Sequence, residues 1–198
     1  MLATCAAALA WGSATPAASA AALAAANPTA GATSATAAAA AYGCPGAHLR
    51  PNASNLAAVE AATLCIVNRV RAAHDAAPLH ANHVLAHVAA GQIAAMVHGD
   101  YFADVSPSGQ TPLSLVAGTA YPAHAASFAV GLNLAYGTGH DVTPAHIVAE
   151  WMASPPHRAI MLSEQYRNAG VAVAPTVPAF LRVGRPEATY AFEFGVRF

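Results

Sequence analysis

The stretch Glu150–Gly170, EWMASPPHRAIMLSEQYRNAG, decides how the rest of the chain is interpreted. It continues a helix that Thr143 can cap and Pro144 can start, because threonine is a favoured N-cap residue and proline fits the first helical turn. The proline pair at 155–156 cannot extend this helix, so we expect the helix to end there. His157 is then expected just past a helix end, where a polar side chain can face a cleft.

This stretch closely resembles the tryptophan–proline–histidine segment of bacterial secreted SCP-like domains. These domains belong to the CAP superfamily of cysteine-rich secretory, antigen and pathogenesis-related proteins. Their pattern reads W-M-x-S-P-G-H-R, followed by an aliphatic run and then a glycine before a strand. Trp151, His157 and Gly170 match this pattern at the family's spacing. The resemblance predicts that companion motifs lie upstream.

Three upstream segments do resemble motifs of the family, each with one departure. The segment N-R-V-R-A-A-H-D-A-A-P-L resembles N-x-x-R-x-x-x-G-x-x-P-L, and Asp75 occupies the position of the family's glycine. Arg71 of this segment is expected to be a structural hydrogen-bond donor. The segment M-V-H-G-D-Y-F-A-D-V-S-P-S-G-Q-T-P resembles M-x-x-x-x-Y-F-x-H-x-S-P-x-G-x-T-P, with Asp104 at the histidine. The segment V-G-L-N-L-A-Y-G resembles G-E-N-I-A-x-G, with Leu132 at the glutamate. The resemblance covers about residues 44–198 and implies an α+β fold, the three-layer α-β-α sandwich of the CAP type.

Periodicity gives a coarse map of the elements. Apolar positions at helical spacing predict helices at about 55–74 and 82–98, the second ending in a turn at Gly99, and a short helix follows at 111–117. Alternation predicts strands at 130–137 and 189–198, with a short strand at 171–174. Residues 176–187 are expected to form a surface loop or a hairpin arm. Composition alone gives only a mixed α and β secreted domain.

Residues 1–42 differ from the rest of the chain in composition. They are rich in alanine, with an apolar run from Leu2 to Trp11 and a small-residue A-x-A box at 18–20. This pattern is typical of an export signal followed by a linker, although no basic residue precedes the apolar run. The alternative is a disordered tail. We therefore expect residues 1–42 to be removed or disordered, and residues 43–198 to form a secreted, extracytoplasmic bacterial domain.

Cys44 and Cys65 are the cysteines that lie beyond this tail. In an exported protein they can form a disulfide, whereas the alternative is a pair of buried free thiols. Similar extracytoplasmic bacterial relatives carry a comparable pair. In the chain-entropy model, closing a loop of this size contributes about 3 kcal/mol to stability.

The charge balance excludes one class of partner. The net charge is −1, and only 9% of the residues are charged. Such a chain lacks the basic surface that binds nucleic acid, so we expect no nucleic-acid partner. We expect a monomer whose ligand the sequence does not identify, with a lipid or a cell-envelope component as candidate classes.

The resemblance also implies a cavity, because metal-binding CAP domains line one with two histidines and acidic partners. His157 matches one histidine, Asp104 replaces the other, Leu132 replaces a glutamate, and Ser154 stands at a second acidic position. Zinc requires three or four well-placed donors, and Asp104 and His157 supply only two. We therefore expect zinc to bind weakly or not at all, and no cofactor. Two other interpretations stay open: His157 as a structural histidine hydrogen-bonded at a helix end, and a separate metal pair on one helix face at residues 83 and 87.

Nucleophilic and nucleotide chemistry have weaker support. The chain has no G-x-S-x-G elbow and no glycine-rich phosphate loop. The sequence therefore favours a non-enzymatic extracytoplasmic SCP-like domain that acts as a binding or envelope-associated module with an altered metal cavity. The alternatives are a secreted metal-dependent hydrolase that uses Asp104 and His157, and a lipid-binding module.

Overall fold

A computed structural model of the protein describes residues 40–41 and 43–198. The predicted export signal and linker lie outside the described residues, apart from Ala40 and Ala41, which are buried against the core. None of the described helices is long and apolar enough to cross a membrane.

The centre of the structure is a four-stranded sheet with the order β1-β3-β4-β2. Strand β4 is antiparallel to both of its neighbours, whereas β1 is parallel to β3. The strands are β1 (His80–Ala81), β2 (Phe128–Thr138), β3 (Asn168–Ala174) and β4 (Glu187–Arg197). The short strand β1 is the one that periodicity does not predict, because two residues are too few to show alternation.

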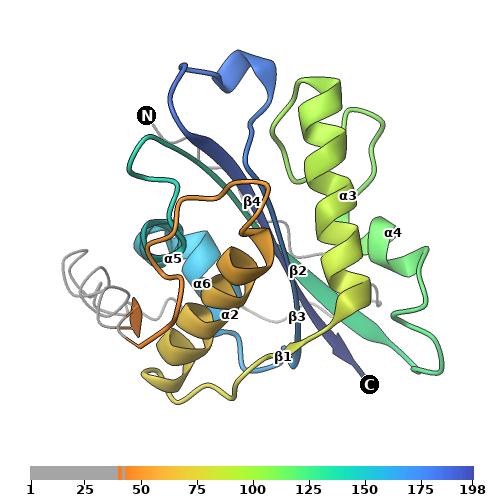
Figure 1. The fold of residues 1–198 in the computed structure, drawn as a ribbon. Coiled ribbons are helices and arrows are strands. Elements are labelled where there is room, and N and C mark those ends of the chain that lie inside the picture. The colour runs from red at the N-terminus through yellow and green to blue at the C-terminus, as the bar shows by residue number, and fades with distance from the viewer. Residues whose placement is uncertain (1–39, 42) are drawn as a thin grey trace.

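Helices cover both faces of this sheet, as Figure 1 shows. One face carries α3 (His83–Gly99) and α4 (Pro112–Ala117). The other face carries α2 (Leu56–Ala72), α5 (Pro144–Ala153) and α6 (Pro155–Leu162). A short 3₁₀ helix, η1 (Ala179–Leu181), is part of the connection that leads from β3 to β4. This arrangement confirms the predicted α+β fold with three layers.

The central strand shows why the sandwich forms. Tyr190, Phe192 and Phe194 pack with the helices on the α2 side of the sheet, and Ala191 packs with α3 on the other side. Both sets are buried because both faces are covered. The alternation that predicts β4 is therefore one of large and small side chains, rather than one of buried and exposed side chains.

The proline pair ends one helix and starts another. Helix α5 stops at Ala153, as expected, and Ser154 takes an extended conformation (φ −91°, ψ 115°). Pro155 and Pro156 then occupy the first positions of α6, where a missing N–H costs nothing. His157 lies beyond the end of α5, as expected, but it is in the first turn of α6 and only 4% exposed, so the expectation that its side chain is presented to a cleft is wrong.

Two aspartates adopt the left-handed conformation, one next to the glycine that was expected to make a turn and one where the family motif has glycine. Gly99 is still helical, and Asp100 takes the left-handed C-cap position with φ 51°. Asp75 has φ 59° at the position where the family motif has glycine. Aspartate tolerates this region better than most residues, since its short polar side chain can bond locally.

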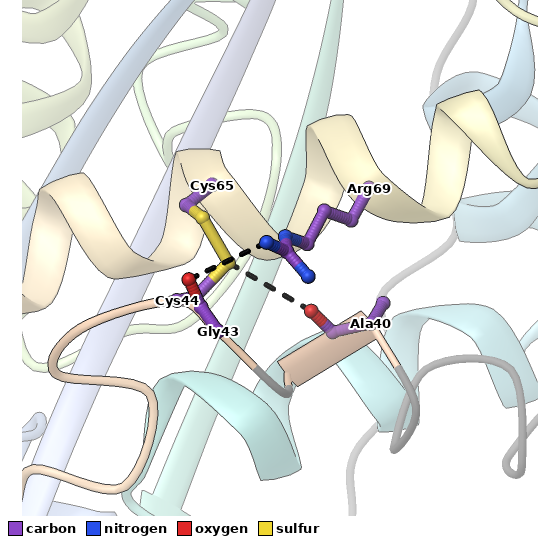
Figure 2. Close-up of a disulfide and its surroundings, with 5 residues drawn as sticks. All are labelled: Ala40, Gly43, Cys44, Cys65 and Arg69. Atoms are coloured by element: carbon purple, nitrogen blue, oxygen red, sulfur yellow. Dashed lines mark hydrogen bonds between the residues drawn. A yellow bond between two sulfur atoms is a disulfide. The ribbon is translucent and has the colours of Figure 1, made fainter.

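The predicted disulfide between Cys44 and Cys65 is present (Figure 2). It joins the segment before α2 to the middle of that helix, and Cys44 Sγ also lies 3.7 Å from the carbonyl oxygen of Ala40. Arg69 Nη2 donates to the carbonyl oxygen of Gly43 at 3.5 Å, so side-chain contacts support the same link.

Reduction of this disulfide should lower the free energy of unfolding by about 3 kcal/mol, because the reduced unfolded chain gains loop entropy. Urea unfolding with and without a reductant that does not absorb in the ultraviolet measures the change. The double variant Cys44→Ala/Cys65→Ala serves as a control, because its stability should not respond to reductant. Equal stability of the oxidised and reduced natural chain would contradict this expectation.

Candidate functional site

Two residues of the family motifs, Asn133 and Trp151, form hydrogen bonds between helices and strand β2. Asn133 Nδ2 donates to the carbonyl oxygen of His157 at 3.2 Å, and Trp151 Nε1 donates to the carbonyl oxygen of Leu134 at 3.2 Å. These bonds join α6 and α5 to the edge strand of the sheet. Asn133 and Trp151 therefore have a structural role, since each donates to a buried carbonyl group that requires a donor.

Arg71 acts as the structural donor that the sequence predicts. Its Nε donates to the carbonyl oxygen of Ala77, and its Nη1 donates to those of Met161 (2.7 Å) and Ser163 (3.0 Å). The side chain is fully buried. Arg71 therefore joins the end of α2 to the end of α6.

His157 is held by its neighbour in the same turn. Its Nδ1 lies 2.8 Å from Ser154 Oγ, within hydrogen-bonding distance. Burial lowers the pKa of the imidazole, because the charged form loses its hydration. A neutral ring bonded to a serine at the helix start fits the structural role at least as well as the role of a metal ligand.

Asp104 lies on the α3 side of the sheet, in the loop that follows that helix. It is 7% exposed, and Gln92 Nε2 donates to its main-chain carbonyl oxygen at 3.1 Å. Burial raises the pKa of the Asp104 carboxyl to about 6. Asp104 is therefore ionised near neutral pH and protonated under mildly acidic conditions.

Leu132 packs as a core residue. It is 2% exposed and belongs to an apolar cluster with Ile93 and Met96 of α3. No oxygen or nitrogen is available on this side chain, so the position that the family fills with glutamate contributes only packing here.

The structure adds Glu193, which the sequence motifs did not indicate. Glu193 of β4 is paired directly opposite Leu132 of β2 and is fully buried. Burial, with a second contribution from the charge of Asp104, raises the pKa of this carboxyl to about 8. Neither of its oxygens has a hydrogen-bond partner within the described part of the chain. One feature of the sequence could have indicated Glu193: in the alternating pattern of β4, this charged residue lies on the same face as the small residues Ala191 and Gly195.

The charge of Asp104 acts on the pKa of Glu193, and the two residues are called the carboxyl pair below. Their pKa values of about 6 and about 8 mean that the pair carries one proton near pH 7. A carboxyl must lose its proton to bind a metal ion, so the retained proton disfavours coordination. The pair is better suited to hydrogen bonding, as are two buried oxygens that have no partner among the described residues, Gln92 Oε1 and Asn133 Oδ1.

The predicted site residues are thus divided between two sides of strand β2. The contacts of Asp104 and Leu132 lie on the α3 side, and those of His157 involve α6 and Asn133. No hydrogen bond or ion pair joins Asp104 to His157 in residues 43–198. Over the same residues, no three histidine, cysteine, aspartate or glutamate side chains are grouped so that they could hold a metal ion. His83 and His87 are exposed on α3.

Comparisons with known proteins agree with this architecture. Residues 64–177 match the model of the CAP family, described as the cysteine-rich secretory protein family. The fold is similar to that of an extracellular protein containing an SCP domain from Bacillus anthracis, with 20% identity and a TM-score of 0.54 over 75% of this chain and 44% of that chain. An outer surface protein from Borrelia burgdorferi matches at 16% identity and a TM-score of 0.54, over 68% of this chain and 90% of that chain. This chain spans less than half the length of the Bacillus protein, and no curated protein matches it.

Proposed function

Since the chain belongs to the CAP family of cysteine-rich secretory proteins, we propose that it is an extracytoplasmic, non-enzymatic CAP domain whose metal cavity is altered. It would act as a binding or envelope-associated module. The observation that carries this proposal is Leu132, an apolar core residue at the position where the family has a glutamate. The disulfide and the extracellular or outer-surface descriptions of the two structural neighbours support an extracytoplasmic location.

The carboxyl pair also supports a binding role. Glu193 lies opposite Leu132, so a carboxyl group is present near that position, although on the neighbouring strand. Its raised pKa keeps it neutral near pH 7, which makes it a hydrogen-bond donor rather than an anionic ligand. A neutral donor beside an ionised aspartate suits the binding of a polar group better than the activation of a metal-bound water.

Zinc binding tests this proposal. We expect weak or no binding to the natural chain by isothermal titration calorimetry. The double variant Asp104→His/Leu132→Glu should bind zinc at least about tenfold more tightly, because the loss of even one supporting group typically costs about 10–100-fold in metal affinity. Adding His157→Ala to the double variant measures whether His157, which lies on the α6 side of β2, contributes to the gain.

Stoichiometric, tight binding of zinc by the natural chain, lost in His157→Ala, would contradict the proposal and favour the metal-dependent hydrolase. Circular dichroism of each variant provides the control, since Leu132→Glu places a carboxyl in an apolar cluster. A folded double variant that gains no affinity for zinc would show that the positions of the family cavity do not correspond to these residues.

A further inference from the structure

The connection between β3 and β4 ends in an exposed apolar tip formed by residues 179–185. Phe180 is 60% exposed and Val183 is 58% exposed. They are two of the five large hydrophobic side chains exposed in the described part of the chain, and the other three, Leu49, Val105 and Phe198, are far from them in the sequence. Isolated exposed hydrophobic residues are ordinary, but two of them within four positions call for an explanation.

The tip also carries positive charge. Arg182 and Arg185 are both exposed and alternate with the apolar residues. Two carboxylates from outside the tip bind its main chain: Asp100 Oδ1 accepts from the N–H of Phe180, and Glu187 Oε1 accepts from the N–H of Val183. The residues of the tip itself are apolar or basic.

The tip is a preformed structure. The N–H of Leu181 donates to the carbonyl oxygen of Pro178 at 3.0 Å, and the N–H of Arg182 donates to that of Ala179 at 3.2 Å. Farther along, the N–H of Gly139 donates to the carbonyl oxygen of Pro186 at 2.7 Å. Figure 1 shows this connection extending beyond the ends of the strands, on the opposite side of the molecule from residue 198. Little conformational entropy would be lost if such a tip docked.

We propose that residues 179–185 insert into the interface of a membrane that contains anionic lipids. Phe180 and Val183 would enter the region between headgroups and acyl chains, and Arg182 and Arg185 would lie among the anionic headgroups. This combination of an apolar insertion and a basic rim is the one that binds proteins reversibly to a membrane surface. The anionic headgroups would attract the two arginines, and the interfacial region beneath them would take up the two apolar side chains.

This inference goes beyond the proposed function, because it concerns a surface that contains no residue of the cavity. Membrane binding by the tip and metal binding by the cavity can therefore succeed or fail independently. The affinity should be modest, since a small apolar insertion and two arginines are weaker than a lipid anchor.

Flotation with vesicles of phosphatidylcholine, with and without phosphatidylglycerol, tests the proposal on the full chain. We expect binding that increases with the phosphatidylglycerol content and decreases with salt. Phe180→Ala should weaken binding about tenfold or more, because it removes most of the inserted apolar surface. Arg182→Gln/Arg185→Gln should weaken it by about fivefold for each charge removed.

Phe198→Ala is the matched control, because Phe198 is equally exposed (63%) and lies on the opposite side of the molecule. The Phe198→Ala variant should bind vesicles as strongly as the natural chain. Both variants contain residues 1–39, so any contribution of these residues to binding is the same in Phe180→Ala and Phe198→Ala. In Phe180→Trp, lipids brominated in the acyl chain should quench the fluorescence of the introduced tryptophan. Binding that is unaffected by Phe180→Ala, or fluorescence of Phe180→Trp that is not quenched, would overturn the proposal, as would the absence of binding to anionic vesicles.

Discussion

Replacing Gly170 with alanine should lower the free energy of unfolding by about 3 kcal/mol or more, since it forces a backbone–backbone clash in the core. Gly170 lies in β3, directly beneath α3. A Cβ atom added there would lie 2.1 Å from the carbonyl carbon of Leu85 and 2.2 Å from the nitrogen of Ala86. Both are main-chain atoms, so no side-chain rotation can relieve the clash. Helix α3 would have to move away from the sheet.

Gly91→Ala is the matched control for this prediction. Gly91 lies on α3, is exposed, and has no atom within 4 Å of an added Cβ. Alanine is the better helix former, so this variant should gain about 0.5–1 kcal/mol. Urea unfolding monitored by circular dichroism measures both changes. If Gly170→Ala were as stable as the natural chain, α3 could not be packed against β3 as described.

Glu193→Gln should remove a large part of the dependence of stability on pH. The unfolded chain releases the Glu193 proton near the ordinary pKa of 4.5, whereas the folded chain retains it to about pH 8 because burial disfavours the anion. Between these values the folded state binds more protons, so the stability of the natural chain falls as pH rises. This loss of stability is absent below the pKa of Glu193 in the unfolded chain and complete above its pKa in the folded chain.

Glutamine is close in shape to a protonated glutamic acid and does not ionise. The variant should therefore match the natural chain to within about 1 kcal/mol at pH 5 and exceed its stability at pH 9 by about 4 kcal/mol more than at pH 5. Asp104 has a pKa raised to about 6, so a smaller loss of stability as pH rises toward 7 should remain in both proteins. Urea unfolding at pH 5, 7 and 9 measures these differences.

Glu164→Gln provides the control, because Glu164 is an exposed glutamate outside the core. Its stability should follow that of the natural chain at every pH. Should Glu193→Gln follow the same curve, Glu193 could not be a buried, protonated group in the folded protein.

Much of the fold could be predicted because the sequence contains both regular alternation and family motifs. The spacing of Trp151, His157 and Gly170 is sufficient to indicate the CAP fold, and the close approach at Gly170 gives a physical reason for its glycine. Helix α6 was missed because prolines indicate the end of a helix, and the same residues are favourable at the start of the next one. A sequence pattern does not separate the two cases when a single residue, Ser154, divides the helices.

The site was harder to predict than the fold. Motif matching identified Asp104, Leu132 and His157 one at a time, but it contains no information about residues outside the motifs. Glu193 becomes relevant only through its pairing with Leu132 and the effect of the Asp104 charge on its pKa. Such proximity depends on strand register, which alternation in a single strand does not specify.

The order of the strands has a consequence for biosynthesis. Strand β4 follows β2 and β3 in the sequence, yet it lies between them and forms the antiparallel ladders that join them. While a ribosome is still translating residues 187–197, both of the earlier long strands lack their main partner, so the sandwich cannot close. Completion of the domain's sheet must therefore wait for the synthesis of these residues.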